Sequence, residues 1–434
     1  MRNDLINLKK SKYVIYGFGK TGKSVKFFLK KNNIKSFFVW DDNWISKKAN
    51  KKVKQIKILS KEIINSDYIV ISPGIQISKA IAKNILKRYT KKIITDLDIF
   101  YLFYPNSKTI MVTGTNGKST TCELLKNLFQ KTKKYNVHLS GNIGRPILYE
   151  RPKNRSLFII EASSYQLYYS KYLRPNHALI INISNDHLDW HINYSNYLNS
   201  KLKIFQNQKN NNFAYLEDLK LITKFKRKKF KGKLITIKKK LKNTFVSNIK
   251  TRYFKNEANL QNLRFVYTIA NKFKIRRKIF FSIINSFKPL PHRGEYLVKK
   301  AGVVFINDSK ATSFEAAKNS LSIHKNIFWI LGGVPKKGEK INLSNYKKSI
   351  IKIYLIGKNI SFFENLIYKK FNYKICHSLK RAFLDIKKDL KKLKSLNTNF
   401  SKTVLLCPAS ASFDQFQNFE ERGLKFKRMV KLYA

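Results

Sequence analysis

The sequence predicts an α/β fold of three domains, and two observations carry this prediction. Short apolar stretches alternate with longer amphipathic ones along the 434 residues, which is the pattern of parallel strands covered by helices. A chain of this length is also too long for one ordinary hydrophobic core, so we expect it to divide into about three domains.

In chain order, the expected strands are residues 13–19, 36–42, 68–74, 109–115, 157–163, 177–184, 303–308, 327–333, 351–357 and 403–410. Several of them end in glycine or a small polar residue, as strands do where they lead into a ligand loop. Breaks near Tyr104-Pro105 and at 289–293 divide the chain into predicted domains at 1–104, 105–292 and 293–434.

The chain is strongly basic, with 89 Lys and Arg against 25 Asp and Glu and a formal net charge of +64. Such an excess is typical of nucleic-acid binders, because cations neutralise phosphates. The basic residues are spread along nearly the whole chain, however, together with many Asn, Ile, Phe and Tyr. We interpret this as A/T-biased codon usage with lysine at solvated positions, and we expect no nucleic-acid partner. The densest basic stretch, residues 224–243, favours a solvated hairpin or loop edge.

The cysteines and the hydropathy of the sequence predict the cellular compartment of the protein. Cys122, Cys376 and Cys407 lack metal or redox spacing, which predicts a reducing compartment and no disulfides. The amino terminus has no apolar signal core, and no apolar run approaches the roughly 18 residues that a bilayer span requires. We expect a cytoplasmic protein that is not inserted in a membrane and is monomeric.

A glycine loop follows the first strand: Gly17-Phe18-Gly19-Lys20-Thr21-Gly22, then a helix and a second strand that ends at Asp41-Asp42. Glycines let a backbone approach a pyrophosphate, and an acid after the second strand can accept a hydrogen bond from a ribose hydroxyl. The spacing fits a nicotinamide cofactor, another nucleotide diphosphate, or a tight turn without a ligand.

A second loop, MVTGTNGKST at 111–120, is a shortened phosphate-binding loop, because Val112 stands where the usual motif has its first glycine. Its amides can surround a triphosphate, Lys118 can neutralise the terminal phosphates, and Ser119 or Thr120 can ligate magnesium. We predict ATP binding here. Glu161 and His187 follow strands beside this loop. Either residue taken singly is more often structural, but the pair favours a second magnesium site.

Several motifs together resemble the Mur ligases, ATP-dependent amino-acid ligases of peptidoglycan synthesis. They are GTNGKST (114–120), GNIG (141–144), EASSYQL (161–167), NDHLDWH (185–191), PHR (291–293) and NDSKAT (307–312). The amino-terminal GFGKTG and the carboxy-terminal PASASFDQFQNFEERG (408–423) resemble the branch that adds D-glutamate to UDP-N-acetylmuramoyl-L-alanine. The resemblance runs from about residue 13 to the end of the chain.

The resemblance implies a Rossmann-like UDP-binding domain, a central P-loop ATPase domain and a Rossmann-like domain for the incoming amino acid. It also implies that the γ-phosphate passes to the substrate carboxylate, and that the amine of D-glutamate attacks the resulting acyl phosphate. The implied catalytic residues are Lys118, Glu161, His187 and Lys201. The implied metal residues are Ser119, Glu161, His187 and Lys201, with Lys201 carboxylated on its amine; a plain solvated lysine is the alternative.

The binding residues carried over fall into three sets. ATP would be bound by Gly114, Thr115, Asn116, Gly117, Lys118, Ser119, Thr120, Asn259, Arg293 and Asp308. The UDP-sugar would be bound by Lys20, Thr21, Asp41, Gly74, Asn142 and Ser163, which makes the first glycine loop a UDP site. D-Glutamate would be bound by Lys310, Thr312, Lys336, Ser412 and Phe419, with Lys337 as a rival to Lys336.

Three other functions stay open at this point. A different amino-acid ligase of the same superfamily is disfavoured by the motif around Ser412. A nucleic-acid-stimulated ATPase lacks a recognition helix or stacking motif. A nicotinamide dehydrogenase leaves the second loop and the carboxy-terminal motif unexplained.

Overall fold

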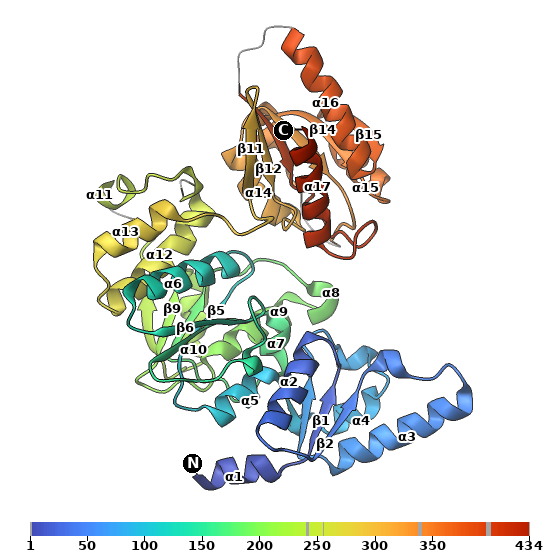
Figure 1. The fold of residues 1–434 in the computed structure, drawn as a ribbon, viewed down its shortest axis with the longest axis vertical. Coiled ribbons are helices and arrows are strands. Elements are labelled where there is room, and N and C mark those ends of the chain that lie inside the picture. Colours follow the sequence, from blue (N-terminus) through green and yellow to red (C-terminus); the bar gives the residue numbers. More distant parts are fainter. Residues whose placement is uncertain (1, 240–242, 255, 337–340, 396–400, 434) are drawn as a thin grey trace. The chain divides into compact units, whose positions relative to one another are not determined.

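The computed structural model describes residues 2–239, 243–254, 256–336, 341–395 and 401–433, and it contains three sheets (Figure 1). The chain divides into two compact units. The first runs through Thr251 and includes Leu260–Ser286, whereas the second holds Arg252–Asn259 and the chain from Phe287 onward. The predicted α/β class is confirmed, because all three sheets are mostly or wholly parallel. The exact domain bounds stay a prediction.

The first sheet has the order β2-β1-β3-β4 and is parallel. Its strands are β1 Tyr13–Tyr16, β2 Phe37–Trp40, β3 Tyr68–Ile71 and β4 Ile93–Ile94. The helices around it are α1 Arg2–Lys10, α2 Lys20–Lys31, α3 Ala49–Asn65, α4 Lys83–Arg88 and α5 Asp96–Phe103, with short 3-10 turns at Asp42–Trp44, Ile77–Lys79 and Thr90–Lys92. Helix α2 packs through Val25, Phe28 and Leu29, whose three- and four-residue spacing forms one apolar face.

The second sheet has the order β10-β9-β8-β5-β7-β6, also parallel. Its strands are β5 Lys108–Thr113, β6 Asn136–Gly141, β7 Ser156–Glu161, β8 His177–Ile180, β9 Phe213–Leu216 and β10 Lys233–Thr236. The helices are α6 Lys118–Thr132, α7 Ser164–Tyr169, α8 Leu188–His191, α9 Tyr194–Leu202, α10 Leu219–Arg227, α11 Asn243–Val246, α12 Glu257–Lys272 and α13 Arg277–Ser286, with 3-10 turns at Ile147–Tyr149, Lys203–Phe205 and Arg252–Phe254. Strands β5, β7 and β8 read as near-continuous apolar runs because helices cover both faces of the sheet.

The third sheet, in the second compact unit, has the order β11-β12-β16-β13-β14-β15, and β11 pairs antiparallel to β12. Its strands are β11 Glu295–Lys300, β12 Val303–Asn307, β13 Ile327–Leu331, β14 Ile350–Ile356, β15 Tyr373–His377 and β16 Lys402–Leu406. The helices are α14 Phe314–Ile323, α15 Ile360–Ile367, α16 Leu379–Ser395 and α17 Phe419–Tyr433, with a 3-10 turn at Ser344–Ser349.

All ten predicted strands are present, and the strands that sequence analysis missed are mostly at sheet edges. An edge strand packs less apolar surface than a central one, so β6, β10, β11 and β15 carry more polar residues and a weaker pattern. The hairpin considered for residues 224–243 is wrong: the stretch holds the end of α10 and the edge strand β10, which runs parallel to β9, and its residues 240–242 lie outside the described ones.

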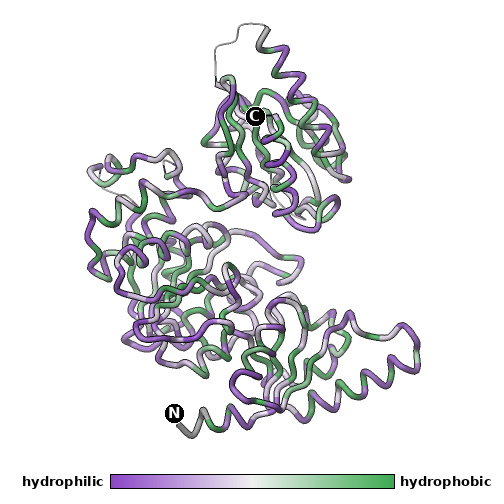
Figure 2. Tube along the Cα trace, in the orientation of Figure 1, coloured by the Kyte–Doolittle hydropathy of each residue, from purple (hydrophilic) through white to green (hydrophobic). Residues whose placement is uncertain are grey.

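Hydrophilic residues are spread over all three sheets of the described chain rather than gathered at one of them. Hydrophilic segments run along the helices of every sheet, while the strands are largely apolar (Figure 2). Among the described helices, none is long and apolar enough to cross a bilayer.

Candidate active site

The phosphate-binding loop joins the carboxyl end of β5 to the amino end of α6 at the centre of the second sheet. Strand β5 pairs with β7 on one side and β8 on the other, and parallel sheets bind ligands at such a change of winding direction. Gly117 has a φ of +84°, and a Cβ there would lie 2.1 Å from Oδ1 of Asn262 in α12. Both the left-handed conformation and the close approach therefore require glycine.

The loop is held against the end of β8 by Asn182. Its carbonyl and side-chain oxygens each accept a hydrogen bond of 2.9 Å, from the amides of Thr115 and Asn116 respectively. The predicted magnesium ligand Ser119 and its neighbour Thr120 are buried in the first turn of α6. This helix has 15 residues, and its amino terminus favours an anionic ligand.

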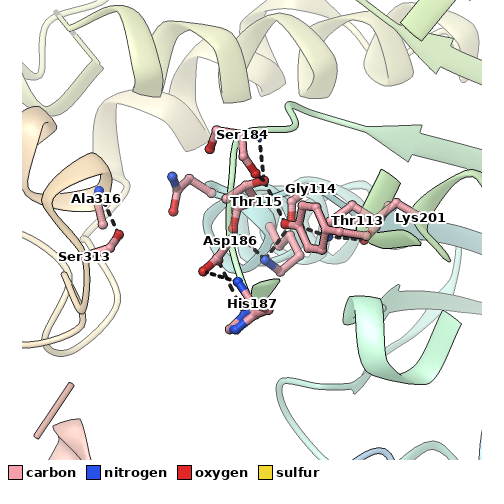
Figure 3. Close-up of polar contacts among 12 residues, drawn as sticks. Thr113, Gly114, Thr115, Ser184, Asp186, His187, Lys201, Ser313 and Ala316 are labelled. Atoms are coloured by element: carbon pink, nitrogen blue, oxygen red, sulfur yellow. Dashed lines mark hydrogen bonds and ion pairs between the residues drawn. The ribbon is translucent and has the colours of Figure 1, made fainter. Parts of the chain in front are cut away.

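Two lysines meet at one carbonyl oxygen of this loop. Nζ of Lys118 lies 2.8 Å from the oxygen of Gly114, and Nζ of Lys201, from α9, lies 2.8 Å from the same atom. Lys201 also donates to Oγ1 of Thr113 at 3.2 Å (Figure 3). Only 1% of Lys201 is exposed. Burial first, and the charge of Lys118 second, lower the pKa of Lys201 well below its ordinary value.

Glu161 ends β7 and lies within electrostatic range of Lys201, on whose pKa its carboxylate acts in the opposite direction. Oε1 of Glu161 accepts a hydrogen bond of 2.9 Å from Nδ2 of Asn142. Oε2 is buried, and no described residue donates to it. A buried carboxylate oxygen without a donor is costly, so its place beside the loop suits a cation.

His187 stands just before α8 in the left-handed conformation, with a φ of +54°. Its Nε2 lies 3.4 Å from Oδ2 of Asp186, and 37% of the side chain is exposed (Figure 3). The imidazole packs on Tyr165 with ring centres 4.8 Å apart. Four residues on, His191 is buried, and burial followed by the charge of His187 lowers its pKa to about 4.

A ready-made metal cluster of three or more His, Cys, Asp or Glu side chains does not occur in the described part of the chain. The predicted metal set differs from such a cluster because it includes a hydroxyl and a lysine. Ser119, Glu161, His187 and Lys201 come from α6, β7, the turn before α8 and α9. The unpartnered Oε2 of Glu161 is the observation in favour of a cation at this set.

The first glycine loop lies at the carboxyl end of β1, with Lys20 and Thr21 in the first turn of α2. A Cβ at Gly22 would lie 2.0 Å from the carbonyl oxygen of Gly17, so the helix approaches the loop closely only with glycine there. Oδ2 of Asp41 accepts a hydrogen bond of 2.7 Å from the amide of Phe18. Asp41 thus shapes the loop, and this bond leaves its carboxylate with further acceptor capacity.

The other predicted UDP-sugar residues belong to neighbouring loops of the same compact unit. Gly74 lies in the loop after β3, Asn142 follows β6, and Ser163 caps α7 through a capping box with Gln166. The Ser163 hydroxyl accepts from the amide of Gln166 at 3.3 Å, so its first role is structural.

In the second unit, the predicted D-glutamate residues follow strands β12, β13 and β16, which are neighbours in the third sheet. Lys310 Nζ lies 3.9 Å from the ring centre of Phe419, which begins α17. Thr312 follows β12, Lys336 follows β13, and both are partly exposed. Lys337 lies outside the described residues. Ser412 is buried and starts a turn rather than the helix, which begins seven residues later at Phe419.

The three ATP residues predicted outside the phosphate loop also lie in the second unit. Asn259 is buried and donates to the carbonyl of Tyr253 at 2.7 Å. Asp308 accepts from Oγ of Ser320 at 2.5 Å and from the amide of Gly294 at 3.1 Å, and burial raises its pKa. Arg293 is partly exposed and acts electrostatically on Asp308. Their roles toward ATP stay predictions.

Sequence reasoning missed several residues that organise these loops. Asp186 stood inside a quoted motif, directly before His187, and Arg422 stood inside the carboxy-terminal motif. Asn262 and Gln76 carried no signal in the sequence, since their contacts join segments far apart in the chain.

Comparison with known proteins agrees with this architecture. Residues 112–285 match the model of the Mur ligase middle domain. The MurF ligase of Thermotoga maritima, solved in complex with ADP, has a TM-score of 0.57 at 16% identity, and the match covers 99% of this chain and 100% of that one. The UDP-N-acetylmuramate–alanine ligase of the same organism has a TM-score of 0.53 at 15% identity, covering 98% and 99%. The chain thus shares its fold with these two ligases.

Relatives of higher sequence identity show which kind of Mur ligase this chain resembles. The UDP-N-acetylmuramoylalanine–D-glutamate ligase of Rickettsia prowazekii (strain Madrid E) is 32% identical over 447 residues, covering 98% of each chain. The ligase of that name from Francisella philomiragia is also 32% identical, covering 98% of this chain and 97% of its own. The chain belongs to the UDP-N-acetylmuramoylalanine–D-glutamate ligase family. It is an ATP-dependent, amide-bond-forming ligase of peptidoglycan precursor synthesis.

Proposed function

We propose that the protein joins D-glutamate to UDP-N-acetylmuramoyl-L-alanine in the cytoplasm, with ATP as the source of energy. Relatives that carry this name match the chain over nearly its full length. The observation that supports the chemistry most directly is the glycine loop before α6, with Lys118 and the buried Lys201 at the carbonyl of Gly114. The three cysteines are free and buried, which fits a reducing compartment.

In this proposal the loop of residues 114–120 holds the β- and γ-phosphates of ATP. Lys118 exchanges its bonds to the loop carbonyls for a bond to the transferred phosphoryl group, whose charge it stabilises. Asn259, Arg293 and Asp308 contribute the remaining ATP contacts. The substrate carboxylate attacks the γ-phosphorus, an acyl phosphate forms, and ADP leaves. The amine of D-glutamate then attacks the acyl carbon and displaces phosphate.

Magnesium fits the residues beside the loop. Ser119, Glu161 and His187, together with a carboxylated Lys201, would hold it, and the ions would neutralise charge on the phosphoryl oxygens. Carboxylation requires a neutral amine, and the burial that lowers the pKa of Lys201 favours that form. The nitrogen of the neutral amine bonds to the carbon of CO2 and one proton is released, so the side chain becomes the anion that a metal site needs.

The two remaining substrates have separate loops in this proposal. The UDP-sugar lies along Lys20, Thr21, Asp41, Gly74, Asn142 and Ser163. D-Glutamate lies along Lys310, Thr312, Lys336, Ser412 and Phe419, where two cations suit its two carboxylates. The protein acts as a monomer.

The test is phosphate release by the purified protein with ATP, magnesium and the two substrates supplied together, singly, and with L-glutamate in place of the D isomer. We expect release to require both substrates and the D isomer. Release that is indifferent to them, or that rises with added nucleic acid, would overturn the proposal.

A further inference from the structure

The loop that carries Gly74 is hydrogen-bonded to the helices that flank His187, although the two belong to different sheets. Nε2 of Gln76 donates to the carbonyl oxygen of Trp190 at 3.0 Å. One residue further, the hydroxyl of Tyr169 accepts from the amide of Ile77 at 3.2 Å and donates to the carbonyl of Ile75 at 3.0 Å. The loop after β3 is thus bonded to α7 through Tyr169 and to α8 through Trp190.

The segment at the far end of the Gln76 bond is strained. Residues 187–192 begin at His187 with a φ of +54° and end at Ile192 with a φ of +71° and a ψ of −48°. The second conformation is close to a classic γ-turn, which is rare, and a β-branched residue adopts positive φ only under constraint. The Ile192 side chain is 76% exposed, so its own packing does not supply the constraint.

The same segment buries polar atoms without satisfying them. Within the described part of the chain, Nε1 of Trp190 and both ring nitrogens of His191 are buried and have no hydrogen-bond partner. The rings pack together instead. Tyr165 lies parallel to His191 with centres 5.7 Å apart, and it also contacts Trp190 and His187. The cluster that holds Trp190 therefore also sets the position of the His187 imidazole.

Strain and unsatisfied groups together mean that contacts from outside the segment hold its arrangement. The hydrogen bond from Gln76 is such a contact, and it comes from the loop that the UDP-sugar would occupy. We propose that Gln76 is a positioning residue that couples occupancy of the UDP-sugar loop to the placement of His187. This inference rests on the proposed function, since it takes the ligand of the Gly74 loop to be the UDP-sugar.

Amide hydrogen exchange tests the coupling without turnover. With UDP-N-acetylmuramoyl-L-alanine added and no ATP, we expect exchange at residues 187–192 to slow by about tenfold in the unaltered protein, in the range of allosteric coupling. Gln76→Ala is expected to abolish most of this slowing, and Tyr169→Phe, which keeps the ring and removes the hydroxyl, to reduce it. Gln55→Ala is the matched control: Gln55 also donates to a tryptophan carbonyl, that of Trp44, but within the first domain. It should leave the slowing intact.

The outcomes separate the coupling from the proposed function. If residues 72–77 become protected by the UDP-sugar and 187–192 do not, or if Gln76→Ala responds as the unaltered protein does, the coupling is wrong and the function stands. If neither region responds to the UDP-sugar, the proposed function itself is overturned. A kinetic readout should agree: Gln76→Ala is expected to raise KM for the UDP-sugar and the magnesium requirement together, with KM for D-glutamate unchanged.

Discussion

Lys118 and Lys201 donate to the same acceptor, the carbonyl oxygen of Gly114, from 2.8 Å each. Two ammonium groups at one oxygen repel, and burial disfavours the charged form of the more deeply buried one. Burial and the charge of Lys118 both lower the pKa of Lys201, against the carboxylates of Asp186 and Glu161, which raise it. Of the two lysines, Lys201 is thus the one whose neutral form burial favours.

The first prediction concerns that amine. Protein incubated with 13C-bicarbonate is expected to show a carbamate resonance by NMR that is absent from Lys201→Met and that disappears on acidification. Lys203→Met is the control, since Lys203 also has a pKa lowered mainly by burial but donates to the carbonyl of Tyr168, away from the phosphate loop. A signal that persists in Lys201→Met would assign the carbamate to another lysine.

The second prediction concerns stability without bicarbonate. The pKa of Lys201 is lower in the folded protein than its unfolded value of 10.5, so unfolding takes up a proton at pH values between the two. The contribution of Lys201 to the free energy of unfolding is therefore most favourable above pH 10.5. It becomes less favourable as pH falls from there toward the folded pKa. Lys201→Met should raise the free energy of unfolding at pH 7 by about 1–2 kcal/mol while abolishing ligation, a stability–activity trade-off. Urea denaturation at pH 7 and pH 10 measures it, and a gain that does not shrink at pH 10 would contradict the explanation.

The third prediction concerns two neighbouring acids at the start of α5. Asp98 accepts from the amides of Thr95, Lys171 and Tyr172 at 2.7–2.9 Å. Oδ1 of Asp96 is buried and has no partner among the described residues, and burial raises the pKa of Asp96 from 3.8 to about 6. Burial raises the pKa of Asp98 too, but three amides donate to its carboxylate, so the two acids should respond oppositely to replacement by the isosteric amide.

The pKa of Asp96 is higher in the folded than in the unfolded protein. Its stabilising contribution is therefore fully present below pH 3.8 and is lost as pH rises through about 6. Asp96→Asn is expected to raise the free energy of unfolding at pH 7.5 by up to roughly 3 kcal/mol, with the gain narrowing at pH 4.5. Asp98→Asn should destabilise at both pH values, because an amide group would face backbone donors. Equal effects of the two changes would show that hydrogen bonding does not distinguish them.

The sequence could predict the local features of this site but not the contacts between distant segments. The apolar runs located the central strands, and Lys118 and Ser119 could be predicted as ligands because the offsets in GTNGKST fix their geometry locally. Lys201 was matched by resemblance, but its meeting with Gly114 joins residues 87 apart, and the Gln76–Trp190 bond joins residues 114 apart. Such contacts depend on tertiary packing, which leaves no periodicity in either segment.

The second unit contains a buried cation that is hydrogen-bonded to two of the three loops of the proposed D-glutamate site, those after β12 and β16. Arg422, only 1% exposed, donates from Nε to Oγ of Ser309 at 3.0 Å, and from Nη2 to the carbonyl oxygens of Ser309 and Ser410 at 2.9 and 3.0 Å. Ser309 precedes Lys310, and Ser410 precedes Ser412 by two residues. Burial lowers the pKa of Arg422 to about 10, so it remains charged near neutral pH.

The fourth prediction follows from that geometry. Arg422→Met roughly keeps the volume of the side chain but removes the three hydrogen bonds that Arg422 donates to the two loops, and Arg422→Lys keeps the charge without the planar fork. Both are expected to raise KM for D-glutamate by about tenfold or more, with KM for ATP and for the UDP-sugar nearly unchanged. Arg428→Met, an exposed change on the same helix α17, is the control for folding and should leave all three constants unaltered. If Arg422→Met lowers the melting temperature and raises the three KM values equally, Arg422 is structural and the D-glutamate loops do not depend on it.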